Sequence, residues 1–221
     1  MQRLALFDLD DTLIDRRRAL EATLTRFASR HGLTVDERDA LLVRLDERAG
    51  AADFSVIREL HGLSPSARTL WQEYLADMAA FSVCPDEVLD GLDDLKGHGW
   101  RIGIATNGSA DIQRAKLEAT GIAQRVDAVC VSADLGLRKP DPRLFATAVE
   151  LCGATPNGGG WMVGDDPVKD IAGGRSAGLA TLWIGTPDRW PGDLHVPDLT
   201  APTVLSAIRL LLEHTAEGGT R

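Results

Sequence analysis

Apolar and polar residues follow two patterns along this chain. Five short apolar runs have the length and the continuous hydrophobicity of strands buried on both faces: residues 4–7, 102–105, 128–131, 161–163 and 181–184. Apolar residues recur at helical spacing after each of the last four runs, over residues 109–120, 142–152, 168–177 and 203–214. This alternation predicts an α/β fold, a Rossmann-like parallel sheet with helices on both of its faces.

One long interval breaks the alternation. Between residues 15 and 84 no run resembles a strand, and apolar residues recur at helical spacing, as at Leu20 and Leu24. The simplest interpretation is an α-helical insert, a small bundle joined by two linkers to an α/β core. We therefore expect a core made of residues 1–14 and 85–221 and a helical domain made of residues 15–84.

Several segments allow a more local interpretation. AGAAD, residues 49–53, has the composition of a loop between helices of the insert. The arginine run at residues 16–18 is typical of a solvated helix start, with a role facing a substrate as the alternative. The proline-bearing stretch after Gly185 predicts a long loop, and the polar tail, residues 213–221, is expected to fray.

The composition argues against a polyanionic partner. The chain has 221 residues, 44% of them hydrophobic, which is enough for one large domain or for a core with an insert. Its 24 Lys and Arg against 33 Asp and Glu give a net charge of −9, which disfavours nonspecific binding to nucleic acid or to an anionic membrane. The three cysteines have no metal-ligand spacing and give no support for a disulfide framework. Since no secretory leader and no run of about 18 apolar residues is found, we expect a cytoplasmic protein.

Polar residues gather where four of the predicted strands end. They are Asp8, Asp10 and Thr12 after the first run, Thr106 and Asn107 after the second, Arg138 and Lys139 after the third, and Asp165, Asp166 and Asp170 after the fourth. In an open parallel sheet, ligands bind at the carboxyl ends of the strands. Each cluster alone is explained equally well by turn formation or helix capping. The four clusters together, along one edge, predict a functional site.

Carboxylates gathered at the end of a buried strand repel one another. The repulsion is on the order of 4 kcal/mol per close pair at the effective dielectric of a protein site. A cation would offset it, and Mg²⁺ fits best because it is held by one or two carboxylates together with water and a substrate phosphate. A nucleophile, a divalent cation and donors for the equatorial oxygens are what phosphoryl transfer requires. The pattern therefore indicates a phosphoryl-transfer site.

The same residues resemble the motifs of a known family. FDLDDTL, ATN, RKP and GDDPVKD occur in the order and at the intervals of the four motifs of the haloacid dehalogenase superfamily, which consists mostly of phosphatases. The helical insert between the first two motifs resembles the C1-type cap of that superfamily. The resemblance covers almost the whole chain. It implies a Mg²⁺-dependent phosphatase that cleaves a small phosphate monoester, with a helical cap over the α/β core.

The resemblance also implies catalytic and phosphate-binding roles. Asp8 would be the nucleophile that forms an aspartyl-phosphate. Asp10 would be the general acid toward the leaving alcohol and then the general base for water. Thr106 and Asn107 would bind the phosphate, and Lys139 would hold the nucleophile and the phosphate by its charge.

A magnesium site follows from the same resemblance. Asp8 and Asp165 would bind Mg²⁺ through their carboxylates, and Asp10 through its backbone carbonyl. Asp166 and Asp170 would lie behind these ligands, where Asp170 would orient a metal-bound water or the lysine of the third motif.

Two other activities stay open at this point. A sugar-phosphate mutase of the same superfamily keeps the second aspartate, and a phosphoaspartate signalling module also uses an aspartate, a metal, a threonine and a lysine. Dehalogenases and phosphonate-cleaving members lack an aspartate two residues after the nucleophile, so Asp10 argues against them. The expected partner is a small phosphorylated metabolite, with no nucleic acid and no membrane. The sequence indicates neither the particular substrate nor the oligomeric state.

Overall fold

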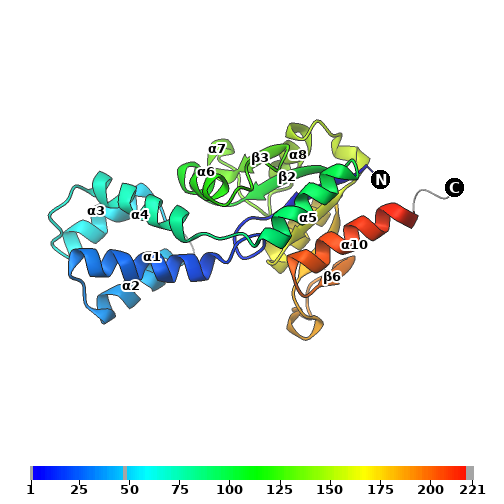
Figure 1. Cartoon of the computed structure of the whole chain (residues 1–221). Helices are drawn as coiled ribbons and strands as arrows, with labels where there is room; N and C mark the ends of the chain where they lie inside the picture. Colours follow the sequence, from blue (N-terminus) through cyan, green and yellow to red (C-terminus); the bar gives the residue numbers. More distant parts are fainter. Residues whose placement is uncertain (1, 47–48, 218–221) are drawn as a thin grey trace.

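The computed structural model describes residues 2–46 and 49–217, which form two parts lying end to end (Figure 1). Within these residues, the first part is a helical bundle made of α1 (Arg16–His31), α2 (Val35–Leu45), α3 (Ala51–Leu60) and α4 (Ala67–Phe81). The second part is a sheet with helices on both sides. Two chain segments connect the parts, one before α1 and one after α4 (Figure 1).

The strands of the described chain form one parallel sheet in the order β3–β2–β1–β4–β5–β6. Their bounds are β1 Leu4–Phe7, β2 Arg101–Thr106, β3 Ala128–Val131, β4 Trp161–Gly164, β5 Ala180–Ile184 and β6 Leu199–Ala201. The strand order reverses between β1 and β4, which is the switch point where doubly wound folds bind ligands. The expected α/β fold, with a Rossmann-like parallel sheet and helices on both faces, is confirmed.

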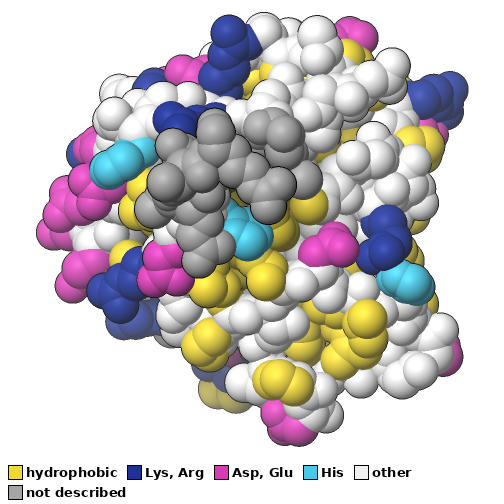
Figure 2. All heavy atoms as spheres, turned by 90° about the vertical axis from the view of Figure 1, so that its right-hand side faces the viewer, with side chains coloured by type: hydrophobic (Ala, Val, Ile, Leu, Met, Phe, Trp, Pro, Cys, Tyr) yellow, Lys and Arg dark blue, Asp and Glu magenta, His cyan; other side chains and the backbone are white. Residues whose placement is uncertain are grey.

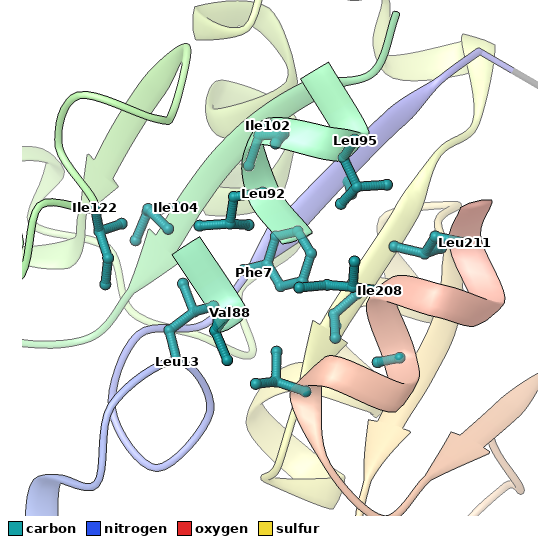
Figure 3. Close-up of a cluster of buried hydrophobic side chains, with 14 of the residues drawn as sticks. Phe7, Leu13, Val88, Leu92, Leu95, Ile102, Ile104, Ile122, Ile208 and Leu211 are labelled. Atoms are coloured by element: carbon teal, nitrogen blue, oxygen red, sulfur yellow. The ribbon is translucent and has the colours of Figure 1, made fainter. Parts of the chain in front are cut away.

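One face of the sheet is covered by α5 (Asp86–Gly97) and α10 (Val204–Glu217). Phe7 of β1 points to this face, where Figure 3 shows it beside Leu92 and Ile208. These three side chains are at most 1% exposed. Full burial of a side chain of this size contributes about 1.5–3 kcal/mol relative to exposure, so this layer holds the central strands in place.

The opposite face is covered by α8 (Pro142–Leu151), where Leu6 of β1 and Phe145 share a buried cluster. Close packing here requires glycine at position 103, because an added Cβ would lie 2.6 Å from Cys152 Sγ and 2.7 Å from Leu6 Cδ2. The remaining helical segments of this part are α6 (Ala110–Ala119), α7 (Ser132–Leu135), α9 (Gly173–Ser176), two 3-10 turns (Pro156–Gly158 and Pro187–Arg189) and a π-helical turn (Pro167–Ala172).

The bundle has a buried core of its own, rich in aromatic side chains. The ring of Phe54 on α3 lies 5.4 Å from that of Trp71 and 5.1 Å from that of Tyr74, both on α4. Helix α4 also contacts the sheet part, since Trp71 Nε1 donates to the Asp111 carboxylate at 3.0 Å. Ile112 belongs to the buried cluster of the bundle. Helix α6, which carries Asp111 and Ile112, therefore links the two parts.

The structure differs from the sequence prediction at residues 49–53, which are not a loop throughout. Gly50 is the N-cap of α3, and its N–H donates to the Asp53 carboxylate at 3.0 Å. The helix therefore begins at Ala51, since glycine and aspartate cap a helix start as readily as they form a turn.

Three further elements differ from the sequence prediction. The prediction contains no helix at the position of α5, which packs directly on the sheet. The stretch after Gly185 is not only a loop, because it includes the edge strand β6 paired with β5. Helix α10 continues to Glu217, within the tail expected to fray, and residues 218–221 lie outside the described chain.

Acidic and basic side chains are interspersed on the end of the molecule that faces away from the bundle (Figure 2). Hydrophobic side chains are also visible on this face (Figure 2). Among residues 2–46 and 49–217, no helix combines the length and the apolar character needed to cross a membrane.

Candidate active site

Asp8 is the first residue after β1, and its N–H donates to Val163 O of β4 at 2.9 Å. This bond extends the pairing of the two central strands and fixes Asp8 at their carboxyl ends. The Asp8 carboxylate lies 2.6 Å from Lys139 Nζ, which lies 2.6 Å from the Asp170 carboxylate as well. The side chains of Lys139 and Asp170 are 2% and 0% exposed. The three groups therefore form a buried charged triad.

The buried triad of Asp8, Lys139 and Asp170 carries one more negative than positive charge. Burial raises the pKa of Asp8 to about 7, against the attraction of Lys139, and the charges of Asp170 and Asp10 add to the rise. Burial alone would lower the pKa of Lys139, but Asp170 and Asp8 raise it above its ordinary value, so the ammonium group keeps its charge. A further cation beside Asp8 would stabilise the ionised carboxylate.

Asp165 follows β4 at the same edge of the sheet. Thr12 Oγ1 donates to its carboxylate at 3.1 Å, and Trp183 Nε1 donates to its backbone carbonyl at 2.8 Å. Burial raises the pKa of Asp165 to about 6, and the charge of Asp8 adds to the rise. One carboxylate oxygen each from Asp8, Asp165 and Asp170 lies within 4.8 Å of the others.

A divalent cation fits this cluster through two of its three carboxylates. Both oxygens of Asp170 are engaged, one by Lys139 Nζ at 2.6 Å and the other by the Asp166 N–H at 3.0 Å. Asp8 and Asp165 offer the carboxylate oxygens that hard divalent cations prefer. Burial raises the pKa of both groups, and the charge of Asp8 adds to the rise at Asp165, so a cation between them would stabilise both ionised forms. The chemistry of the donor set therefore fits a divalent cation between Asp8 and Asp165.

The π-helical turn after β4 explains the position of Asp166. One oxygen of its carboxylate accepts from the N–H groups of Val168 and Lys169, at 2.9 and 2.8 Å. Asp166 therefore caps this turn, and its own N–H fixes Asp170. Both oxygens of each of these two carboxylates thus accept from donors of the described chain.

Thr106 is the last residue of β2, and Asn107 begins the following loop. Their side chains have different hydrogen-bond partners. Gln113 Nε2 donates to Thr106 Oγ1 at 2.6 Å, which leaves the hydroxyl proton of this buried threonine for another acceptor. The Asn107 side chain accepts from the backbone N–H of Lys139 at 2.9 Å and donates to its carbonyl at 3.1 Å. The Asn107 amide therefore holds the loop that carries Lys139.

The carboxylate of Asp10 is turned toward α6. Lys116 Nζ lies 2.7 Å from one of its oxygens, and Gln113 Nε2 donates to the other at 3.1 Å. Lys116 Nζ also donates to the Gln113 amide oxygen at 3.0 Å. Gln113 and Lys116 are 1% and 2% exposed. Both oxygens of Asp10 are thus held by buried side chains of a single helix.

A cavity of about 580 Å³ lies over these residues, and its wall includes Asp8, Asp10, Asn107, Lys139, Asp165, Asp166 and Asp170. The bundle contributes Arg16, the first residue of α1, whose side chain is only 16% exposed. Its Nη2 donates to Leu45 O at 3.0 Å. The expected solvated helix start is therefore wrong for Arg16, which faces the cavity, whereas Arg18 is exposed and lies outside this wall.

Comparison with known families agrees with this geometry. A family model described as haloacid dehalogenase-like hydrolase matches residues 5–184. The chain belongs to this family. The matched range contains all the strand ends from which the candidate site of this haloacid dehalogenase-like hydrolase is built.

Individual relatives match over different lengths. Phosphoserine phosphatase of Thermus thermophilus is 34% identical over 149 residues, which cover 65% of this chain and 59% of that protein. The chain spans about half the length of three curated relatives that it matches, from 45% to 59%. These matches therefore support the family for the aligned part.

Two solved structures are similar over almost their full length. A HAD phosphatase from Thermococcus onnurineus is 25% identical, with a TM-score of 0.69 and coverage of 96% of this chain and 98% of that one. A 2-haloacid dehalogenase from Pseudomonas syringae is 26% identical, with a TM-score of 0.73 and coverage of 97% and 99%. A phosphatase and a dehalogenase thus share this fold, so the chemistry has to be argued from the residues of the site.

Sequence reasoning about this haloacid dehalogenase-like hydrolase misses the partners of Asp10. Gln113 and Lys116 belong to no motif that was recognised, although they lie three residues apart on the helix after the second strand end. One signal was available, because both lie on the buried face of α6 between Ile112 and Leu117. Polar side chains on a buried helix face need partners, which here are provided by Asp10 and by each other.

Proposed function

We propose that the protein is a Mg²⁺-dependent phosphatase that cleaves a small phosphate monoester through an aspartyl-phosphate on Asp8. One observation carries the proposal: the Asp8 carboxylate, paired with buried Lys139 at 2.6 Å, shares one cavity with Asp165 and with an Asp10 held by α6. One edge of the sheet then provides the groups that the reaction requires. They are a nucleophile, ligands for a cation, donors for the phosphate and a second carboxylate for proton transfer.

In the first half of the reaction, an oxygen of Asp8 attacks phosphorus and the bond from phosphorus to the substrate oxygen breaks. Asp10 gives a proton to the departing oxygen, an effect typically worth 10²–10⁴ in rate. Lys139 and the hydroxyl of Thr106 bind the equatorial oxygens as they gain charge. Asp8, Asp165 and the backbone carbonyl of Asp10 would hold Mg²⁺, which would supply positive charge to the phosphoryl group.

In the second half, Asp10 takes a proton from water, and the water oxygen attacks the phosphorus of the aspartyl-phosphate. Phosphate leaves and the Asp8 carboxylate is restored. Splitting the reaction through a covalent intermediate replaces one high barrier by two lower ones. Asp170 and Asp166 keep Lys139 and the loop after β4 in place through both halves.

We also propose that residues 15–84 act as a cap over a core of residues 1–14 and 85–221. Arg16 supports this, because a residue of the bundle lines the cavity over the sheet part. A cap of this kind excludes water and contributes contacts to the leaving group. The cytoplasmic location expected from the sequence stays a prediction.

Asp10 also separates this proposal from dehalogenation, the activity named for the Pseudomonas syringae neighbour. A halide leaves without a proton, so a carboxylate that gives a proton to the leaving group has a use in that step only with an alcohol leaving group. A sugar-phosphate mutase stays the enzymatic alternative, since it needs the same two aspartates.

The test is a turnover screen of the purified chain against p-nitrophenyl phosphate and a panel of phosphorylated metabolites, with Mg²⁺ and with EDTA. We expect phosphate release with Mg²⁺ and none from the Asp8→Asn variant. After a rapid acid quench, we expect phosphate bound covalently to the peptide that contains Asp8. Isomerised sugar phosphate without net phosphate release would favour the mutase. A long-lived phosphoprotein in the unmutated chain would favour the signalling module, and turnover by Asp8→Asn would refute the mechanism.

A further inference from the structure

A small recess of about 40 Å³ adjoins the catalytic cavity, between the bundle and the sheet part. Arg16, Asp10, Asn107 and Arg138 line both spaces, so the recess opens from the cavity next to Asp10. Under the proposed function, Asp10 gives its proton to the leaving oxygen. The recess therefore lies on the side where the leaving group of the substrate extends.

Two guanidinium groups line this recess. The Arg138 side chain forms no hydrogen bond or ion pair with another residue of the described ranges, 2–46 and 49–217. Arg16 donates to the Leu45 carbonyl, and its Nη1 lies 3.8 Å from the Asp46 carboxylate, too far for a hydrogen bond. The other charged groups of the recess, Asp10 and Lys116, neutralise each other at 2.7 Å. Arg138 therefore brings to the recess a positive charge that no residue of the described ranges pairs with.

Tyr74 adds a hydroxyl from a buried side chain to the same wall. It comes from α4, is 1% exposed, and its hydroxyl has no hydrogen-bond partner among the described residues. Burial raises the pKa of Tyr74 well above its ordinary value, so the group stays a donor. The hydroxyl of a buried tyrosine usually has a hydrogen-bond partner, and a ligand group in the recess would provide one.

We propose that the substrate carries a second anionic group, a carboxylate or a phosphate, and that Arg16, Arg138 and Tyr74 bind it in this recess. The inference rests on the proposed phosphatase function and narrows its substrate class. Guanidinium groups match the geometry of carboxylates and phosphates, and their hydrogen bonds to such anions are about twice as strong as neutral ones. The size of the recess suits a compact anion better than a base or a sugar ring.

The test compares substrates that differ only in the second group. For a carboxylate, 3-phosphoglycerate is compared with glycerol 3-phosphate; for a phosphate, ethylene glycol bisphosphate is compared with 2-hydroxyethyl phosphate. We expect kcat/KM to be at least about tenfold higher for the anionic member of one pair, and the pair that responds identifies the anion. Arg138→Gln and Arg16→Gln should each lower that ratio by about tenfold, chiefly through KM.

Arg18→Gln is the matched control, because Arg18 lies two residues from Arg16 but lines a different cavity. It should keep the wild-type ratio. Ratios near one in both substrate pairs, or a ratio that both recess variants preserve, would overturn the inference while p-nitrophenyl phosphate is still hydrolysed. Loss of turnover with every phosphate ester, including p-nitrophenyl phosphate, would instead overturn the proposed function, and this inference with it.

A second inference rests on the helix behind Asp10. Lys116 is a buried lysine, and burying an ammonium group costs several kcal/mol unless it is paired and hydrogen-bonded. Its partners are Asp10 and Gln113, and Gln113 Nε2 donates to both Asp10 and Thr106. We infer that Gln113 and Lys116 are positioning residues, which fix the Asp10 carboxylate in the orientation needed for proton transfer and tie it to the phosphate-binding hydroxyl.

Lys116→Met tests this role, with Gln113→Leu as a second variant if the first does not fold. A misdirected Asp10 slows attack by water more than loss of p-nitrophenol, which leaves with little protonation. We therefore expect a burst of p-nitrophenol, then slow turnover, and phosphate accumulating on the Asp8 peptide after acid quench. Lys116→Arg, which can still pair with Asp10, should show a smaller burst.

Ile112→Val is the control, since Ile112 lies on the same helix but packs in the bundle. It should show no burst. A merely structural role for Lys116 and Gln113 would slow both halves of the reaction together. Folded variants that lose turnover without a burst and without phosphorylated Asp8 would therefore overturn the inference.

Discussion

The metal-free protein should lose stability as the pH rises from 5 to 8, because of Asp8 and Asp165. Burial raises the folded-state pKa of Asp8 from 3.8 to about 7 and that of Asp165 from 3.8 to about 6. Such a group stabilises the folded state fully below its unfolded pKa, and this contribution disappears as the pH rises through the folded pKa. At pH 5 the unfolded chain has already released these protons, while the folded chain still holds them.

The size of the effect follows from the pH interval over which the two states differ. Between pH 5 and about 7, Asp8 spans two pH units at about 1.4 kcal/mol each, or about 3 kcal/mol. Asp165 spans about one unit between pH 5 and about 6, or about 1 kcal/mol, part of which depends on the charge of Asp8. We expect a total loss of about 3–4 kcal/mol, a large fraction of the stability of an ordinary domain.

Urea unfolding followed by circular dichroism at pH 5 and pH 8 in EDTA measures this loss. Asp8→Asn should remove most of it, because the amide does not ionise, while Asp193→Asn, at an exposed position, should keep it. Added Mg²⁺ should stabilise the wild type more at pH 8 than at pH 5, since it binds ionised carboxylates. Equal stability of the metal-free wild type at both pH values, or a full pH dependence in Asp8→Asn, would refute the reasoning.

Three further predictions concern the metal, the buried lysine and the sheet core. Removal of divalent cations with EDTA should abolish turnover of p-nitrophenyl phosphate, and Asp165→Asn should raise the Mg²⁺ concentration needed for half activation by about tenfold; an unchanged activation curve would contradict the ligand assignment. Lys139→Met should cost about 3–5 kcal/mol of unfolding free energy at pH 8, because two buried carboxylates lose their cation, and unchanged urea unfolding would contradict the triad. Leu92→Ala should cost about 2–5 kcal/mol and leave kcat per folded molecule unchanged; a large drop in kcat would contradict a purely structural role.

The sequence was sufficient to predict which strand ends meet, because the topology of a parallel sheet leaves little choice. Asp8 and Asp165 follow the neighbouring strands β1 and β4, and the regular 4.7–4.9 Å spacing of strands brings such ends together whatever the helices do. Lys139 lies farther along, in the loop after β3 and α7, where the Asn107 side chain holds it. Apolar runs on the buried strands made these elements visible. Strand β6 was missed because its three residues, Leu199–Ala201, give too short an apolar signal.

The orientation of side chains above the strand ends was not predictable in the same way. Asp10 pairs with residues more than 100 positions along the chain, so its direction depends on how α6 is rotated against β1. Arg16 faces the cavity because its guanidinium donates to Leu45 at the end of α2, a contact that depends on bundle packing. Periodicity places a residue on a face of its own helix, but it does not say which neighbour that face meets.

Helix α6 contacts the bundle through one turn and holds the Asp10 carboxylate through the next. Asp111 and Ile112 contact the bundle, while Gln113 and Lys116, within the next turn, hold Asp10. A helix turn behaves as a rigid unit, so a displacement of one face displaces the other. The recess lined by Arg16 and Tyr74 lies against the same turn. The position of the bundle therefore bears on Asp10, the proposed acid–base group, as directly as on the recess proposed to bind the substrate.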